Sequence, residues 1–108
     1  MFFNYNQNNS GGYFDVNNDV TVNVYIEANS VEEANTKAEE IGIYFDGCEY
    51  DRDCPCCGDR WYRADSYDEV TEVPEASRFD VRWVKVGEPH TIVYYADGSV
   101  ERKVREED

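Results

Sequence analysis

The sequence predicts an α+β fold in which a mainly antiparallel sheet of about six strands carries one helix packed on one face. Three observations favour this fold class. Residues 20–27 alternate apolar and polar side chains with the period of a strand, residues 31–41 repeat apolar side chains with the period of a helix, and Asp97-Gly98 separates two strand-like runs. The length of 108 residues predicts a single domain, 1–108.

The first expected element is a hairpin made of two aromatic runs, 2–5 and 13–16, joined by the polar loop 6–12. The Asn, Ser and Gly residues of this loop tolerate the positive φ angles that a reversal requires. After a second reversal, the alternation over 20–27 predicts a strand with one face buried and the other exposed to water.

A helix is expected over 31–41. Ser30 and Glu33 have the spacing of a capping box, and Gly42 is suited to end the helix. The apolar stripe of this helix is narrow and rich in alanine, which predicts close packing on the sheet. Its members are Val31, Ala34, Ala38 and Ile41.

Later strand signals are weak at 61–62 and 70–73 and stronger at 81–86. Residues 91–95 and 100–104 form the clearest hairpin, because Asp-Gly strongly favours a two-residue turn. The predicted core brings apolar residues of the strands and the helix together. Its members are Val22, Val24, Ile26, Ala34, Ala38, Ile41, Trp83 and Ile92.

The composition is strongly acidic. Twenty-four Asp and Glu stand against ten Lys and Arg, for a net charge of -14, and residues 15–80 hold eighteen of the acids and five of the bases. This balance argues against direct binding of nucleic acid or of an anionic membrane. The chain also lacks an apolar run long enough to cross a bilayer and a signal peptide, so we expect a cytoplasmic protein.

A Cys-rich loop is expected at 46–61. Its run 54–58, Cys-Pro-Cys-Cys-Gly, has the C-P-x-C-G form of a zinc knuckle, in which two thiolates two residues apart converge on one ion. One knuckle is half a site, and further ligands must come from elsewhere. The candidate ligands of a structural Zn²⁺ are Cys48, Cys54, Cys57 and His90.

Two other interpretations of the cysteines stay open. In a reducing cytoplasm they can be free thiols, some of them packed as small apolar residues, whereas in a secreted protein they could form two disulfides within the loop. Cys56 is the less suitable zinc ligand because it is adjacent to Cys57. His90, taken alone, is more typical of a surface or packing histidine.

No catalytic motif stands out. Nucleophile elbows, phosphate-binding loops and H-E-x-x-H are absent, and no spacing singles out a pair of carboxylates as acid and base. With one histidine and no partner motif, Cys-His catalysis has little support. The sequence therefore predicts a protein that is not an enzyme.

Three runs of the sequence carry a resemblance to known proteins: the start 2–12, the strand and helix region 25–43, and the Cys block 54–61. Over about residues 2–62 the chain resembles small acidic uncharacterised proteins of tailed bacteriophages. That resemblance implies a setting, the cytoplasm of an infected bacterial host, and no active site. Small proteins in that setting often bind and disable host defence or redirect host machinery.

The first functional hypothesis is a non-catalytic phage accessory protein, an acidic inhibitor of a host defence or nucleic-acid-acting protein. Its partner would be a host protein with a basic surface, because spaced carboxylates can replace the phosphates that such a surface normally contacts. Exposed aromatic side chains would supply apolar anchors. The expected partner-binding residues are Glu32, Glu33, Glu39, Glu40, Asp46, Glu49, Asp51, Asp53, Asp59, Trp61 and Tyr62.

Two alternatives come from other classes. A sponge that sequesters a nucleotide defence signal needs basic residues around a pocket, and Arg78, Arg82 and Lys85 are its candidates. A zinc-stabilised adaptor module would use the Cys loop to present Arg60, Trp61 and Tyr62 to a partner.

Overall fold

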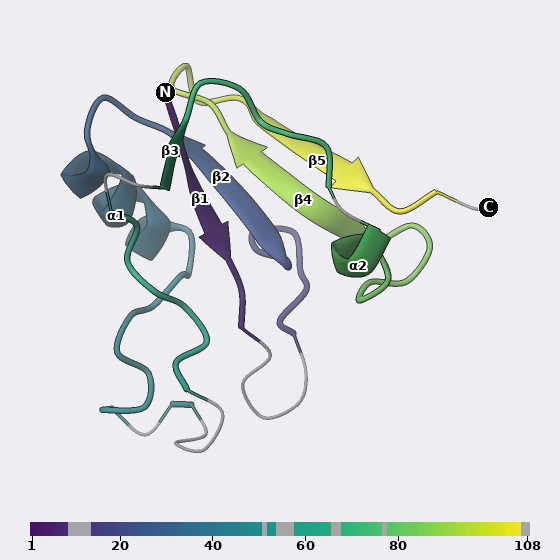
Figure 1. The fold of residues 1–108 in the computed structure, drawn as a ribbon, viewed down its shortest axis with the longest axis horizontal. Helices are drawn as coiled ribbons and strands as arrows, with labels where there is room; N and C mark the ends of the chain where they lie inside the picture. The colour runs from purple at the N-terminus through teal and green to yellow at the C-terminus, as the bar shows by residue number, and fades with distance from the viewer. Residues whose placement is uncertain (9–13, 51, 54–57, 66–67, 77, 107–108) are drawn as a thin grey trace.

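The computed structural model describes residues 1–8, 14–50, 52–53, 58–65, 68–76 and 78–106. Within these residues one five-stranded sheet has the order β3-β1-β2-β4-β5 (Figure 1). The elements are β1 (Phe2–Asn6), β2 (Asn23–Glu27), α1 (Val31–Glu40), β3 (Glu69–Val70), α2 (Arg78–Val81), β4 (Pro89–Tyr94) and β5 (Val100–Val104). The predicted α+β class is confirmed.

The sheet is mixed, which corrects the expectation of about six mainly antiparallel strands. β1 pairs antiparallel with β2 and β3, and β4 pairs antiparallel with β5, but β2 and β4 run parallel with Val24 opposite Ile92. A parallel pair needs a long crossover, which the chain between β2 and β4 supplies with α1, β3 and α2. Local sequence patterns do not report such a pairing.

α1 forms as predicted, one residue shorter at its end. The backbone N–H of Glu33 donates to Ser30 Oγ at 3.2 Å, and Gly42 follows the helix with a φ of 102°. Ala34 and Ala38 are fully buried against the sheet. The hydroxyl of Tyr5 on β1 donates to Asn35 Oδ1 at 2.7 Å, which adds a polar contact between helix and sheet.

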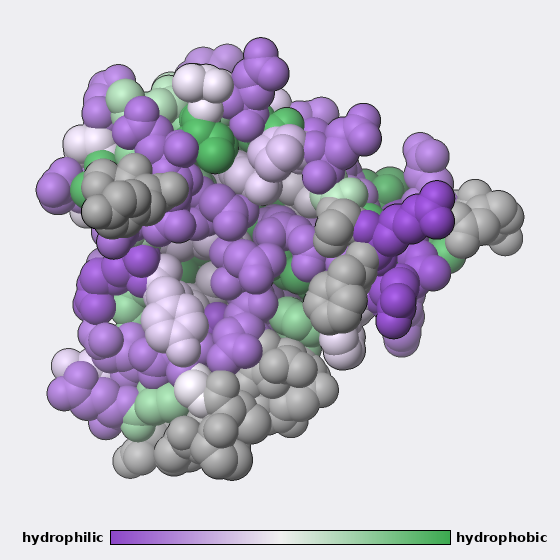
Figure 2. Space-filling view, viewed as in Figure 1, coloured by the Kyte–Doolittle hydropathy of each residue, from purple (hydrophilic) through white to green (hydrophobic). Residues whose placement is uncertain are grey.

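The main core lies between α1 and the sheet, and the face seen in Figure 2 is mostly hydrophilic with scattered hydrophobic residues. Of the eight predicted core residues, Val24, Ile26, Ala34 and Ala38 belong to this core, Ile41 is partly buried against it, and Val22 and Ile92 are also buried. Trp83 is wrong as a core residue, because it is 43% exposed and its ring contacts Phe14 at 5.1 Å between centroids. The buried cluster includes Phe3, Tyr5, Val20, Val24, Ile26, Ala28, Ala34, Ala38, Ile43, Phe45, Trp61 and Ala64.

The opposite face of β2 is also buried, which corrects the expectation of a water-exposed face. Thr21 just before the strand, and Asn23 and Tyr25 within it, are all less than 9% exposed. β2 is the central strand, and α2 covers this side of it, where Asn23 Nδ2 donates to Asp80 Oδ2 at 2.9 Å. Burial, followed by the charge of Asp80, raises the pKa of Tyr25.

Three local predictions have different outcomes. β1 pairs with β2, so a hairpin with 13–16 is wrong: residues 14–16 lie outside any strand, and residue 13 is outside the described residues. The strand expected at 81–86 is also wrong, since α2 and turns occupy this segment. The β4–β5 hairpin is confirmed, with Gly98 at a φ of 91° in its turn.

Neither helix in the part of the chain that the structure describes is long and apolar enough to span a bilayer.

Candidate functional site

The exposed face of α1 carries a row of carboxylates. Glu32, Glu39 and Glu40 are exposed, as expected for partner-binding residues. Glu33 is partly exposed and pairs with Lys37, whose Nζ lies 3.1 Å from Glu33 Oε1. Lys37 Nζ also donates to the carbonyl oxygen of Glu27, so the one base of the helix is bound to the protein itself.

Most other bases of the acidic segment 15–80 are also engaged inside the protein. The Arg52 guanidinium lies 3.8 Å from the centre of the Tyr44 ring. Arg63 Nη1 lies 2.9 Å from Asp46 Oδ2. Arg60 is buried, as described below, so of the five bases only Arg78 lies apart from these contacts.

The loop after α1 continues the acidic surface. Glu49 is exposed and Asp46 and Asp59 are partly exposed, whereas Asp51 lies outside the described residues. Tyr62 is 57% exposed, as a contact aromatic should be. Tyr50, at 68%, is the more exposed aromatic of this loop.

Two expected partner-binding residues are buried, which corrects their assignment. Trp61 is 1% exposed and belongs to the hydrophobic core. Asp53 is 7% exposed and accepts hydrogen bonds from the Tyr44 hydroxyl at 2.6 Å and from the Arg60 backbone N–H at 2.8 Å. Neither can reach a partner, because aromatic burial and charge pairing hold them inside the fold.

Asp53 belongs to a buried polar network centred on Arg60. The Arg60 Nε atom lies 3.8 Å from Asp53 Oδ1, 3.4 Å from Asp15 Oδ2 and 3.2 Å from the Tyr44 hydroxyl, to which it donates. Arg60 Nη1 donates to Gln7 Oε1 at 2.9 Å. Burial and the hydrogen bond to Asp53 raise the pKa of Tyr44 to about 12. The network therefore ties segment 44–60 to the end of β1.

Gly47 is required by this network. A Cβ at Gly47 would lie 1.9 Å from Asp53 Oδ2 and 2.9 Å from the Tyr44 ring. The Gly47 carbonyl oxygen accepts from the backbone N–H groups of Arg52 and Asp53, so the turn is folded tightly over the Asp53 carboxylate. Only a residue without a side chain allows this approach.

Two of the four expected zinc ligands, Cys48 and His90, lie among the described residues. Cys54 and Cys57 lie outside the described residues. Cys48 is partly buried, and its backbone N–H donates to Asp59 Oδ1 at 2.9 Å. His90 lies at the start of β4, which is next to α2 in Figure 1, whereas Cys48 lies in the loop that follows α1. The zinc site formed by His90 with the three cysteines stays a prediction.

The surroundings of His90 suit a packing histidine. Its Nδ1 lies 2.8 Å from Thr91 Oγ1, and burial, followed by the charge of Lys103, lowers its pKa. Among the described residues, no group of three or more His, Cys, Asp or Glu side chains has the arrangement of a metal site.

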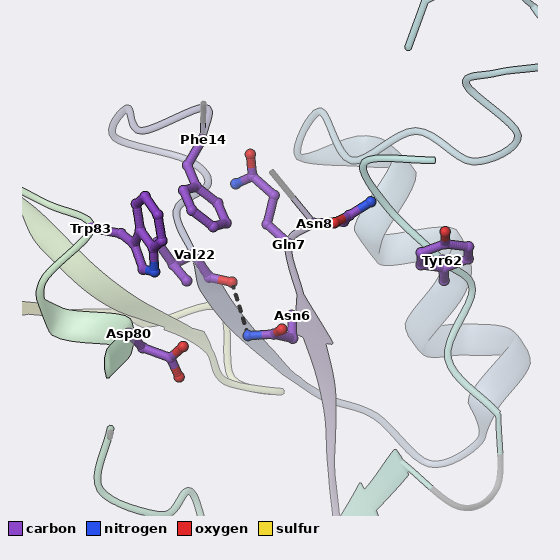
Figure 3. Close-up of a pocket in the computed structure, with 8 residues that line it drawn as sticks. All are labelled: Asn6, Gln7, Asn8, Phe14, Val22, Tyr62, Asp80 and Trp83. Carbon is purple, nitrogen blue, oxygen red and sulfur yellow. Dashed lines mark hydrogen bonds between the residues drawn. The ribbon is translucent and has the colours of Figure 1, made fainter. Parts of the chain in front are cut away.

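A cavity of about 500 Å³ opens where β1 ends and β2 begins, next to α2 (Figure 3). Phe14 and Trp83 form an aromatic wall on one side, Tyr62 lies on the other, and Asp80 lies below Trp83. The complete described lining is Asn6, Gln7, Asn8, Phe14, Val22, Tyr62, Asp80 and Trp83. Of these residues, only Tyr62 is among the expected site residues. The others form no recognisable sequence motif, because the cavity combines residues from separate segments of the chain.

A second cleft of about 500 Å³ lies between α2 and the chain after β5. Arg78, Arg82 and Arg105 line it together with Glu106. Two of the candidates for nucleotide binding thus share a cleft with Arg105, whereas Lys85 is not part of its described lining. Arg105 Nη1 donates to the Val84 carbonyl oxygen at 2.8 Å, which fixes its position.

Comparison with known proteins gives one match. Neither the curated proteins nor the solved structures searched contain a match to this chain. A family model described as "Domain of unknown function (DUF7296)" matches residues 1–107, nearly the whole sequence. The chain therefore belongs to the DUF7296 family.

Proposed function

We propose that this protein is a non-catalytic binding protein whose acidic surface inhibits a host protein with a basic surface. In this proposal it acts in the cytoplasm of an infected bacterial host, on a defence or nucleic-acid-acting protein. The acidic surface is defined as Glu32, Glu33, Glu39 and Glu40 of α1 with Asp46, Glu49 and Asp59 of the following loop.

One observation carries this proposal. The nearby bases Lys37, Arg52, Arg60 and Arg63 are held by contacts within the protein, while the carboxylates of α1 face outward. Of the seven carboxylates of the acidic surface, Glu33 and Asp46 are paired with Lys37 and Arg63, so the surface keeps a negative net charge that favours encounter with a partner of opposite charge.

Charge alone gives encounter rate and specificity, so an anchored interface also needs apolar contacts. Tyr50 and Tyr62 supply two exposed rings beside the acidic loop residues. Trp61, by contrast, supports the interface only from within, through the core.

Capture from bacterial lysate on immobilised protein tests the proposal. At low salt the captured set should be enriched in basic nucleic-acid-binding proteins, and these should elute as salt rises past about 0.1 M, where the Debye length falls below ~10 Å. Capture should not require DNA. Excess DNA should compete with the immobilised protein for the basic partners and lower their capture. A captured set with no excess of basic proteins would reject the proposal.

A second function, sequestration of a nucleotide signal, is favoured by the cleft that Arg78, Arg82 and Arg105 line. Guanidinium groups bind phosphates through charge and paired hydrogen bonds. Native mass spectrometry of the protein from infected cells separates the two functions. A retained nucleotide lost in the Arg78→Ala/Arg105→Ala variant would favour sequestration, and a retained basic protein would favour inhibition.

We also propose that Cys54 and Cys57, together with Cys48, bind one structural Zn²⁺. The C-P-x-C-G knuckle supports this proposal. Protein purified without chelator should contain about one zinc per chain, and chelation should lower the melting temperature. Metal-free protein with four titratable thiols and an unchanged melting curve would reject it.

A further inference from the structure

The cavity lies between the end of β1, the start of β2 and helix α2. None of the residues that define the acidic surface is in its described lining. We propose that this cavity binds an arginine side chain of the basic protein partner. The inference rests on the proposed function and adds to it a defined pocket, built from Phe14, Trp83, Asp80 and Asn6 (Figure 3).

The aromatic wall is the first argument. The rings of Phe14 and Trp83 lie 5.1 Å apart at 56°, and Trp83 stays 43% exposed although it is large and apolar. An indole face is the best aromatic surface for a cation, and a guanidinium can also stack on it as a plane. A partner residue over Trp83 would bury a side chain that the fold itself leaves in contact with water.

The hydrogen-bonding character of the lining is the second argument. Asn6 Nδ2 donates to Asn23 Oδ1 at 2.7 Å, and Asn8 Nδ2 donates to the Asp59 carbonyl oxygen at 3.1 Å. Gln7 Nε2 donates to two backbone carbonyl oxygens, of Asp15 and Thr21. These hydrogen bonds, with those that Gln7 Oε1 accepts from the Asp15 backbone N–H and from Arg60 Nη1, hold the polar side of the lining in a fixed arrangement, which lowers the entropy cost of binding a ligand.

The charge of the cavity is the third argument. Among the described residues that line the cavity, Asp80 is the one Asp or Glu, and none is Lys or Arg. The hydrogen bond from Asn23 Nδ2 holds the Asp80 side chain in place. A guanidinium carries five N–H donors in a rigid plane and suits a carboxylate near an aromatic face better than a compact ammonium does.

The volume fits a segment of protein better than an isolated side chain. About 500 Å³ is within the range of small-molecule pockets, so an arginine would enter with part of its flanking chain. A neutral ligand, such as a sugar, could use the rings and amides equally, but it would gain nothing from Asp80 or from the net charge of -14. These two features favour the cation.

Tryptophan fluorescence gives a direct test, because Trp61 is buried and Trp83 is exposed. The probe is a pentapeptide with a central arginine and lysine neighbours, and the control is the same peptide with neutral citrulline at the centre. The arginine peptide should change the emission of Trp83 and saturate, and the citrulline peptide should bind at least tenfold more weakly. Trp83→Phe should abolish the signal and leave the melting curve unchanged.

Two variants separate this inference from the proposed function. Asp80→Asn keeps an acceptor for Asn23 and should weaken the arginine peptide at least tenfold. Reversal of Glu32, Glu33, Glu39 and Glu40 to Lys should slow association but leave the preference for arginine over citrulline intact. Equal affinity for both peptides, or an unchanged affinity in Asp80→Asn, would overturn the inference. If the reversal variant still loses its basic partner in that case, the proposed function stands without the arginine pocket.

Discussion

α1 and segment 44–61 both position acidic residues at the surface, but they are attached to the sheet by different forces. α1 is held by apolar contact, through fully buried Ala34 and Ala38. Segment 44–61 adds buried charges to apolar contact, since Arg60 and Asp53 are both less than 9% exposed and Phe45 and Trp61 belong to the core. The comparison teaches that the two parts of the acidic surface rest on different supports, which respond to different substitutions.

The two supports also differ in how well they tolerate substitutions. An apolar contact loses free energy roughly in proportion to the area and volume removed, whereas a buried ion network fails when one member is lost. A further link joins them, since Asn35 of α1 accepts from the Ala64 backbone N–H at 2.9 Å and donates to the Ala64 carbonyl oxygen. The predictions below separate the two supports, from the largest expected effect to the smallest.

Ala38→Glu should have the largest effect. It places an unpaired carboxylate at a fully buried position between α1 and the sheet. We expect a loss of more than about 4 kcal/mol, enough to remove the cooperative thermal transition of most domains. Thr36→Glu adds the same charge on the exposed side of α1 and should melt almost as the parent does. A native transition in Ala38→Glu would contradict the packing described.

Arg60→Ala should destabilise the protein by about 3–5 kcal/mol, because it leaves the Asp53 carboxylate buried without its charge partner. Urea unfolding measures the change. The matched control is Arg63→Ala, which removes an ion pair exposed on both sides and should cost less than about 1 kcal/mol. Equal losses in the two variants would show that the Arg60 network does not support the segment.

Gly47→Ala should cost about 1–3 kcal/mol, since the new Cβ would overlap the Asp53 carboxylate. In an Asp53→Ala background the same substitution should cost less, because the atoms it meets first are gone. Urea unfolding of the four proteins in this cycle measures the coupling. Strict additivity would mean that Gly47 and Asp53 do not meet as described.

The smallest effect is expected at alkaline pH. The pKa of Tyr44 is raised from 10.0 to about 12, so the folded state favours the neutral hydroxyl. The stability that this gives is complete below pH 10 and is lost as pH rises from 10 to about 12. The difference in unfolding free energy between the parent and Tyr44→Phe should therefore fall over this range. A constant difference would show that Tyr44 titrates normally.

The parts of the fold that the sequence predicts correctly are those specified by a few neighbouring residues. The capping box at Ser30 and Glu33 and the turn at Asp97-Gly98 each specify a conformation within four residues, and both elements form as expected. The parallel pairing of β2 with β4 depends on residues almost seventy positions apart, and no local pattern records it. The strand expected at 81–86 fails for a related reason, since β4 already has β2 and β5 as neighbours.

The candidate site was predictable in its charge and not in its geometry. The spacing of acids on α1 places Glu32, Glu39 and Glu40 at the surface, as a helix requires. Nothing in the sequence distinguishes Asp53 from the exposed acids around it, because its burial depends on Arg60 and Tyr44 folding over it. The helical period of apolar and polar residues helps only where a helix exists, and segment 44–61 has none among its described residues.

The most direct test of the central claim, that the acidic surface binds a basic protein, compares two charge reversals of equal size. One variant changes Glu32, Glu33, Glu39 and Glu40 to Lys, and the other changes Glu72, Glu75, Glu101 and Glu106, which are also exposed but lie outside the acidic surface. Both should keep a cooperative melting transition, and low-salt capture is quantified by mass spectrometry. The account predicts that only the first variant loses the basic proteins that the parent captures; equal capture by the two variants would contradict it.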